Sequence, residues 1–317
     1  MCGLYGFVNY SGNKQKKLSD LTNALAEQSA VRGIDATGIA FCDSSGINIL
    51  KESKSAYNLD FKHSDEICSL TGHTRHSTQG SEKRNYNNHP FPGKCKNSNF
   101  ALSHNGVLTN DKKLRKKFKL PKTKIETDSY IAVQLIESQK KLDFDSIKFM
   151  AEKTEGSFSY TILDDKNNIW LVKGESPLSI LHFPKQKMYV YASTDEILYK
   201  ALVDYPPLFT ALKKGEFEEV KISEGDILKI RPDGGLEKKT FEYHYYYSRG
   251  WWDYGIMSNK KSSSKNGYIQ DDYAEDLKMA ASYYGYYPED VDELIQSGFS
   301  YDEIEEYLYC GCVGGEI

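Results

Sequence analysis

The segment Cys2-Gly3-Leu4-Tyr5-Gly6-Phe7-Val8 decides what fold to expect, because Leu4 to Val8 is a short apolar run typical of a buried strand. Cys2 stands directly before this run, and removal of Met1 makes it the N-terminal residue, with a thiol and a free α-amine. Such an amine has a pKa of ~7.7 to 8.0, so it can take the thiol proton near neutral pH. Considered alone, a cysteine at this position is more often incidental.

Short apolar runs of the same kind recur through the first 240 residues. They are Gly38 to Phe41, Phe100 to Ser103, Phe158 to Leu163, Ile169 to Val172, Ser179 to His182 and Met188 to Ala192. Two other stretches, Leu18 to Ala30 and Ser129 to Ser138, repeat apolar residues at intervals of three and four, which predicts helices. Asp128 is placed to act as the N-cap of the second helix. Many buried strands with packed helices predict a layered α+β or sandwich domain.

The composition excludes several classes of protein. With 39% apolar and 27% charged residues, the 317-residue chain has the composition of a folded globular protein. No run reaches the roughly 18 to 20 apolar residues of a membrane-spanning helix, and the N-terminus lacks the features of a signal peptide. The six cysteines form no C-x-x-C pair and no regular framework. We therefore expect a cytoplasmic protein, without a membrane partner, whose cysteines are thiols.

Charge divides the chain near residue 240. Residues 241–317 contain 5 basic and 15 acidic residues, whereas residues 1–240 contain 36 basic and 30 acidic residues. Of the 24 tyrosines, 14 also follow residue 240. This shift predicts a domain over residues 1–240, an aromatic and Ser/Lys-rich linker over 241–265, and an acidic, Tyr-rich helical tail over 266–317.

The tail contains a degenerate repeat. Segments that begin at Gly267-Tyr268, Gly285-Tyr286 and Gly298-Phe299 share acidic and apolar positions. Pro288 at a first-turn position, and Ser300 followed by Glu303, mark two helix starts. We expect a small three-helix appendage, which serves either as a solubilising tail or as a module that binds a partner.

Six colinear blocks carry a stronger signal. They are Cys2 to Gly6, Arg32 to Gly38, Gly72 to Gly80, Asn88 to Pro90, Ser103 to Asn110 and Glu126 to Asp128. In order and spacing they resemble the glutaminase domain of class II glutamine amidotransferases. This group of N-terminal nucleophile (Ntn) hydrolases includes glucosamine-6-phosphate synthase and amidophosphoribosyltransferase. The resemblance covers about residues 2 to 235 and does not reach the tail.

The resemblance implies a fold, a reaction and a set of catalytic residues. The fold is a four-layer α-β-β-α sandwich of the Ntn hydrolase type, and the reaction converts L-glutamine to glutamate and ammonia. Cys2 is the nucleophile, and Asn105 with Gly106 forms the oxyanion hole, which needs preorganised N–H donors. Without the surrounding block, Asn105-Gly106 is also typical of a β-turn.

Free glutamine carries a carboxylate and an ammonium group, which suit a cation and an anion in the pocket. The resemblance implies that Arg75 and Thr78 hold the carboxylate and that Asp128 holds the amino group. Arg32 matches an arginine near the nucleophile, although a structural ion pair with Asp35 or a neighbour is a serious alternative. His76 and Gln79 depart from the tryptophan and histidine of the sugar-synthase relatives.

The remaining signals are weaker. The resemblance implies that His104 is structural and that no cofactor is needed; the histidine spacing also gives no zinc site. The basic run from Lys112 to Lys119 is typical of a solvated helix face, so we expect no nucleic-acid partner.

Ammonia then passes to a separate acceptor protein, or the protein is a stand-alone γ-glutamyl amide hydrolase. A non-catalytic adaptor that binds a partner through the acidic tail is the alternative from another class.

Overall fold

The computed structural model describes residues 2–12 and 15–244, together with residues 277–278, 287–297, 299 and 304 of the C-terminal part. The chain divides into two compact units, Met1–Tyr247 and Ser248–Ile317. Within the described residues, every helix is too short or too polar to cross a lipid bilayer.

A first antiparallel sheet is built around the segment that opens the chain. Its strand order in the described residues is β11-β9-β10-β1-β4-β2-β3. The bounds are β1 (Gly3–Asn9), β2 (Ala36–Asp43), β3 (Gly46–Glu52), β4 (Ser69–Arg75), β9 (Ser179–Phe183), β10 (Met188–Ala192) and β11 (Glu218–Glu219). Strand β1 lies between β10 and β4, in the registers Tyr5↔Ala192 and Gly3↔Thr74. All of its residues are buried, which explains why the run is apolar on both faces.

The second antiparallel sheet carries the block from Ser103 to Asn110. Its strand order is β13-β12-β8-β7-β6-β5. The bounds are β5 (Phe91–Lys94), β6 (Asn99–Leu108), β7 (Gly156–Asp164), β8 (Ile169–Lys173), β12 (Asp226–Ile230) and β13 (Leu236–Thr240). Strand β6 pairs with β7 along its whole length, but its pairing with β5 ends at Phe91↔Leu102.

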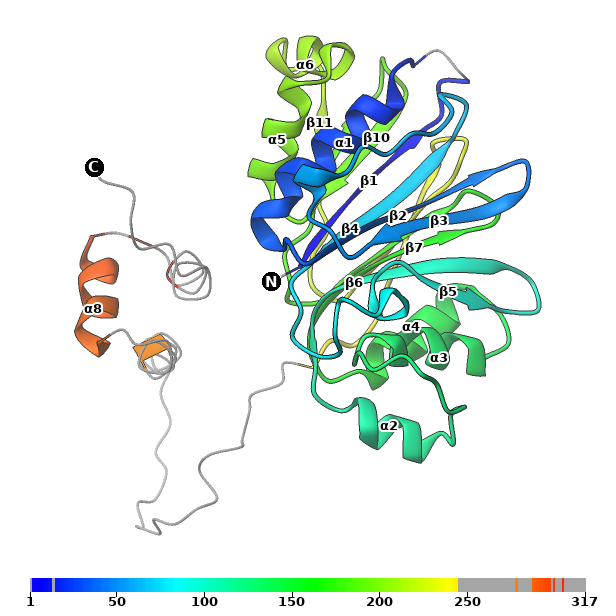
Figure 1. Ribbon diagram of the computed structural model, residues 1–317. Coiled ribbons are helices and arrows are strands. Elements are labelled where there is room, and N and C mark those ends of the chain that lie inside the picture. Colours follow the sequence, from blue (N-terminus) through cyan, green and yellow to red (C-terminus); the bar gives the residue numbers. More distant parts are fainter. Residues whose placement is uncertain are drawn as a thin grey trace. The chain divides into compact units, whose positions relative to one another are not determined.

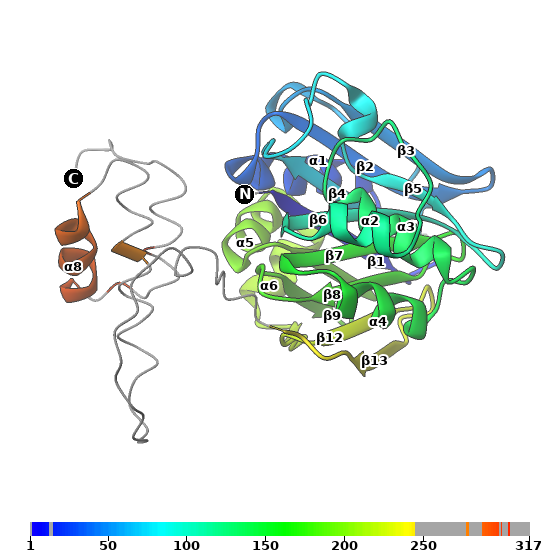
Figure 2. The same cartoon turned by 90° about the horizontal axis from the view of Figure 1, so that it is seen from below.

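The two sheets pack face to face between two helix layers, as Figures 1 and 2 show. The layer on the first sheet contains α1 (Leu18–Ser29), α5 (Asp195–Val203) and α6 (Pro206–Lys213), and that on the second contains α2 (Asp111–Lys117), α3 (Tyr130–Ser138) and α4 (Phe144–Lys153). Single-turn 3-10 helices cover Ala30–Arg32, Ala56–Asn58 and Asn85–Asn87. Separate apolar clusters fill the three interfaces between layers. The expected α-β-β-α sandwich is confirmed.

The helix at Tyr130–Ser138 forms as predicted, but Asp128 is not its N-cap. Ser129 occupies that position, and its side chain makes no capping hydrogen bond. The Asp128 carboxylate instead accepts the backbone N–H of Leu108 at the end of β6, at 2.6 Å. The N–H of Leu108 thus takes the place of the N–H groups at the start of the helix as donor to Asp128. It lies 20 residues away in the sequence, so a local sequence pattern cannot indicate this contact. The aspartate therefore ties the start of α3 to the strand that carries Asn105.

The packed part of the first unit continues past Thr240. Phe241 is 6% exposed and belongs to the apolar cluster between the second sheet and its helices. Its ring centroid lies 6.0 Å from that of Phe158, and the Tyr243 ring meets the same Phe158 at 5.4 Å. The first residues of the segment expected as linker thus cover the second sheet.

In the C-terminal unit, α8 (Pro288–Gln296) begins at Pro288 as predicted. Val291, Leu277 and Ile304 are buried in one small cluster. Two of them, Val291 and Ile304, stand at equivalent positions of the repeat, so the apolar repeat positions supply this core. The predicted helix start at Ser300 lies outside the described residues.

The packing of Phe241 gives a test of where the domain ends. In the full-length chain, Phe241→Ala should lower the free energy of unfolding of the N-terminal unit by about 3 kcal/mol, because it leaves a cavity over Phe158. Tyr57→Ala, at a side chain 57% exposed, is the matched control and should change little. Denaturant unfolding followed by circular dichroism measures both. Equal stability of the two variants would place Phe241 outside the core.

Candidate active site

Cys2 lies where β1 meets β4. Because Gly3 pairs with Thr74, the residue before β1 is brought beside the end of β4. The half-buried Cys2 Sγ accepts the backbone N–H of His76 at 3.4 Å and lies 3.5 Å from the His76 carbonyl oxygen. From α1's side of the sheet, Arg32 Nε donates to the Cys2 carbonyl at 2.9 Å. The backbone and the sulfur of Cys2 are therefore both held.

The thiol at this position needs a base. Burial raises the pKa of Cys2 above its ordinary value, although the His76 N–H and the cations of Arg75 and Arg32 act in the opposite direction. The thiol form therefore predominates at neutral pH, and the nucleophilic thiolate requires that a neighbouring group take the proton.

Arg75 is buried at the end of β4 and binds the loop that follows it. Its Nη1 donates to Asn88 Oδ1 at 2.6 Å, and its Nη2 donates to the carbonyl oxygens of Gln79 and Gly80 at 2.8 and 2.7 Å. Three of the five N–H donors of a guanidinium are thus used by described residues. The other two, on Nε and Nη1, have no hydrogen-bond partner among the described residues. Thr78 lies exposed in the same loop.

Asn88 and Glu126 hold Arg75 and the loop that follows it by hydrogen bonds. The sequence analysis assigned neither of them a role. Asn88 Nδ2 donates to the Glu82 carbonyl at 2.8 Å while its Oδ1 accepts from Arg75. The Glu126 carboxylate accepts from Arg84 and from Asn87 Nδ2, and its carbonyl accepts from the Gln79 side chain. The sequence could have pointed to both residues, because Asn88 stands in the block Asn88 to Pro90 and Glu126 stands in the block Glu126 to Asp128.

Asn105 has the surroundings of a ligand-binding amide. It is 1% exposed, and neither Nδ2 nor Oδ1 has a hydrogen-bond partner among the described residues. Buried amides nearly always have partners, so an unpartnered one calls for an explanation, such as a bound water or ligand. On β6 the side chains at odd positions, such as Ala101, face the first sheet, whereas Phe100 and Leu102 face the helices. By this alternation Asn105 faces the sheet that carries Cys2.

At two positions of this site, Gly106 and Gly33, the backbone packs too closely against other backbone to leave room for a side chain. Gly106 has φ +136°, and a Cβ there would lie 2.0 Å from the Ser157 carbonyl oxygen of β7. A Cβ on Gly33 would lie 2.3 Å from the Arg75 carbonyl carbon and 2.5 Å from the His76 nitrogen. Neither position accepts a side chain without displacing backbone that belongs to the site.

Three histidines, His73, His89 and His104, are buried near these residues. His73 Nε2 is 3.0 Å from the carbonyl oxygen of His104, and the rings of His73 and His89 are 4.1 Å apart. His104 stacks on Tyr160 at 4.8 Å, and its Nδ1 pairs with Ser129 Oγ at 2.8 Å. Burial lowers the pKa of all three imidazoles, so they are neutral. Within the described residues, no three His, Cys, Asp or Glu side chains are grouped to hold a metal ion.

The predicted residues therefore form two groups that approach each other from the two sheets. Cys2, Arg32 and Arg75 gather at the end of β4, and Asn105, Gly106 and Asp128 gather at the end of β6. Asp128 and Arg75 are near enough for their charges to interact. Arg32 contacts the backbone of Cys2 through its Nε, so it lies near the cysteine as the resemblance implies. Asp35 in turn accepts the N–H of Ser77, at 2.7 Å.

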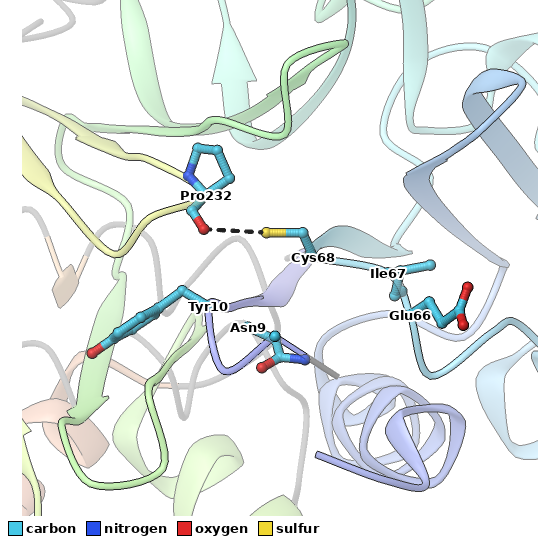
Figure 3. A pocket seen from close by; sticks show the side chains of 7 residues that line it. Asn9, Tyr10, Glu66, Ile67, Cys68 and Pro232 are labelled. Carbon is cyan, nitrogen blue, oxygen red and sulfur yellow. Dashed lines mark hydrogen bonds between the residues drawn. The ribbon is translucent and has the colours of Figure 1, made fainter. Parts of the chain in front are cut away.

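A surface hollow with a second half-buried cysteine lies at the other end of β1 (Figure 3). It is lined by Asn9, Tyr10, Gly12, Glu66, Ile67, Cys68 and Pro232. Cys68 Sγ lies 3.8 Å from the Pro232 carbonyl oxygen, and burial raises the pKa of its thiol. No cationic side chain lines this hollow in the described part of the chain, in contrast to the surroundings of Cys2. The described cysteines are all free thiols.

Lys51 gives the site a testable pH dependence. Its Nζ donates to the carbonyl oxygens of Asn88 and Pro90 at 2.5 and 3.1 Å, and burial together with Arg75 lowers its pKa to about 8. Between about pH 8 and the ordinary lysine pKa of ~10.4, the unfolded chain thus binds more protons than the folded chain, so stability rises with pH. Relative to Lys51→Met, the parent should gain about 2 kcal/mol of unfolding free energy across this range.

The measurement is denaturant unfolding of both proteins at several pH values. Lys54→Met, at a lysine side chain 57% exposed, is the control and should follow the parent at every pH. Parallel curves for the parent and Lys51→Met would contradict the lowered pKa.

Comparisons with known proteins agree with this geometry. Residues 73–200 match a family model described as a glutamine amidotransferase domain. The glutamine–fructose-6-phosphate aminotransferase (isomerizing) of Sulfurisphaera tokodaii is 31% identical over 189 residues, which are 57% of this chain and 31% of that protein. The same enzyme of Staphylococcus epidermidis is 32% identical, over 57% of this chain and 30% of that protein. The chain thus spans about a third of the length of these curated relatives.

Among solved structures, the phosphoribosylpyrophosphate amidotransferase of B. subtilis shares the fold. It superposes with a TM-score of 0.59 at 19% identity, over 77% of this chain and 50% of that chain. The family model, the curated relatives and the four-layer sandwich lead to one conclusion. The N-terminal part of this chain is a class II glutamine amidotransferase domain of the Ntn hydrolase type.

Proposed function

We propose that this domain hydrolyses the side-chain amide of L-glutamine to glutamate and ammonia through a thioester on Cys2. The buried, unpartnered amide of Asn105, next to a glycine that no other residue can replace, carries the proposal. Such a pair of N–H donors, fixed before the substrate arrives, is what an oxyanion hole requires.

The steps are built on the two groups of residues. After Met1 is removed, the α-amine of Cys2 takes the thiol proton, and Sγ forms a bond to the amide carbon of glutamine. The oxyanion accepts from Asn105 Nδ2 and the Gly106 N–H. The carbon–nitrogen bond then breaks, and the amine returns the proton to the departing ammonia. Water finally adds to the thioester, which releases glutamate and restores the thiol.

Glutamine is the donor that the relatives have in common. The names of the curated relatives and of the B. subtilis structure all include glutamine, but they give different acceptors, fructose-6-phosphate and phosphoribosylpyrophosphate. We assign the substrate carboxylate to Arg75 and Thr78 and the ammonium group to Asp128. Two free guanidinium donors and the buried Asp128 carboxylate suit these roles.

The acceptor does not come over from the relatives, since the likeness covers about a third of their length. We propose that the ammonia passes to a separate acceptor protein in the cytoplasm. A stand-alone γ-glutamyl amide hydrolase releases ammonia without any partner, and an adaptor releases none. Glutamate release by the purified chain, with and without a captured partner, distinguishes the three.

The nucleophile can be identified by labelling. The mature protein should lack Met1, and a chloroketone analogue of glutamine should modify Cys2 alone, because among the described cysteines only Cys2 lies beside the proposed glutamine pocket. Intact-mass and peptide mass spectrometry show both. Cys68→Ser is the control and should be labelled like the parent. Active protein that retains Met1, or a label on Cys42, Cys68 or Cys95, would overturn the mechanism.

The two groups of residues should affect different kinetic constants. Asn105→Ala should lower kcat by roughly 10² to 10³ with little change in KM, because its donor acts in the transition state. Arg75→Lys should raise KM for glutamine by about tenfold or more, since an ammonium group cannot replace the planar guanidinium. Asn97→Ala, at an asparagine that bonds Leu142 away from the site, should leave both constants unchanged. A rise in KM alone for Asn105→Ala would refute its role.

A further inference from the structure

A hydrogen bond connects the two sheets directly before Asn105. His73 lies in β4 and is 1% exposed, and its Nε2 lies 3.0 Å from the carbonyl oxygen of His104 in β6. That carbonyl belongs to the peptide bond that joins His104 to Asn105. The pairing of β6 with β5 ends at Leu102, two residues earlier. On this side of β6, a side chain from the other sheet therefore holds the backbone where strand pairing has stopped.

The chemistry of this contact fixes the state of the imidazole. A carbonyl oxygen only accepts hydrogen bonds, so Nε2 must carry the hydrogen. Burial and the neighbouring Arg75 lower the pKa of His73 to about 3, so the ring is neutral at neutral pH. The ring packs against that of His89 at a tilt of 34°, with 4.1 Å between the centroids. His73 is thus a fixed, uncharged donor.

The same face of β4 serves both groups of site residues. Thr71, His73 and Arg75 alternate along the strand and so point to one side, toward the second sheet. Thr71 reaches Thr161 of β7, at 2.7 Å between the hydroxyl oxygens. Arg75 binds the loop around the glutamine pocket. His73 stands between them and is the one of the three that contacts β6 by a described hydrogen bond.

The Asn105 side chain is buried and has no described hydrogen-bond partner that could orient it, so the position of its backbone matters for its direction. We propose that His73 is a positioning residue for the oxyanion hole: by donating to the His104 carbonyl, it holds the His104–Asn105 peptide so that the Asn105 amide and the Gly106 N–H point at the oxyanion. This inference rests on the proposed glutaminase reaction. His73 itself touches neither the substrate nor the sulfur in this role.

The test uses full-length protein and steady-state glutamate release. His73→Leu removes the donor and should lower kcat about 10- to 100-fold, with KM for glutamine within about twofold, because a small misplacement of catalytic donors affects the transition state most. His73→Gln carries an amide nitrogen near the position of Nε2 and should restore kcat to within about threefold. Thr71→Val is the matched control, since it removes an intersheet hydrogen bond from the same strand, and should stay within about twofold of the parent.

A double-mutant cycle tests whether His73 acts through Asn105. In an Asn105→Ala background, His73→Leu should change kcat by less than about twofold, since the donor that it positions is already gone. Additive losses would overturn the proposal, as would a loss confined to KM or an equal loss in Thr71→Val. Should His73→Leu fail to fold, the comparison of His73→Gln with His73→Asn decides instead. The shorter Asn amide cannot reach the carbonyl, so equal activity of the two would contradict the role.

A spectroscopic measurement separates this inference from the proposed reaction. In a spectrum of protein with ¹⁵N-labelled histidine, the His73 signals, identified by their loss in His73→Gln, should show a neutral ring protonated at Nε2. A ring protonated at Nδ1 overturns the inference while leaving the glutaminase reaction intact. Absence of both glutamate release and Cys2 labelling in the parent protein refutes the proposed reaction instead.

Discussion

The pairing of β1 between β10 and β4 is the constraint on which the rest of the structure depends. It places the first strand of the chain inside the sandwich, with every residue from Gly3 to Asn9 buried. The residue that precedes such a strand is held at the edge of the core and cannot move freely. The thiol and the α-amine that we assign to catalysis are therefore attached to a rigid element, which reduces the entropy lost on reaching the transition state.

The candidate site residues come from both sheets, so that their polar groups approach one another from different layers of the fold. Arg75 lies in the first sheet and Cys2 directly precedes strand β1 of that sheet, whereas Asn105 lies in the second sheet and Asp128 in the segment between α2 and α3. Hydrogen bonds to backbone carbonyls hold Arg75, and a backbone N–H holds Asp128. The side chains that would meet glutamine are thus fixed mainly by main-chain atoms, whose positions the sheets determine.

The sequence was sufficient for the elements whose pattern is local. The seven apolar runs all form strands, because strands buried on both faces consist of continuous apolar residues. Six of the described strands went unpredicted, namely β3, β4, β5, β11, β12 and β13. Strands β3 and β13 are half-exposed or exposed and contain charged residues, and the buried β4 consists largely of polar residues. The position at which the packed domain ends could also not be predicted from the composition. The charge shift begins at residue 241, but Phe241 and Tyr243 pack on Phe158, and composition does not report such long-range contacts.

For the site, motif spacing named the residues but not their contacts. Asn88 and Glu126 act through hydrogen bonds that span up to 47 residues, which no local pattern reveals. Gly33 contributes to the site through a contact of this long-range kind. It has no functional group, and its backbone is extended, but any side chain on it would collide with the peptide that joins Arg75 to His76. Even an added methyl group would displace the donor to the Cys2 sulfur and the anchor of the guanidinium together. In a mutational scan Gly33 would therefore score like an active-site residue, although it meets no substrate.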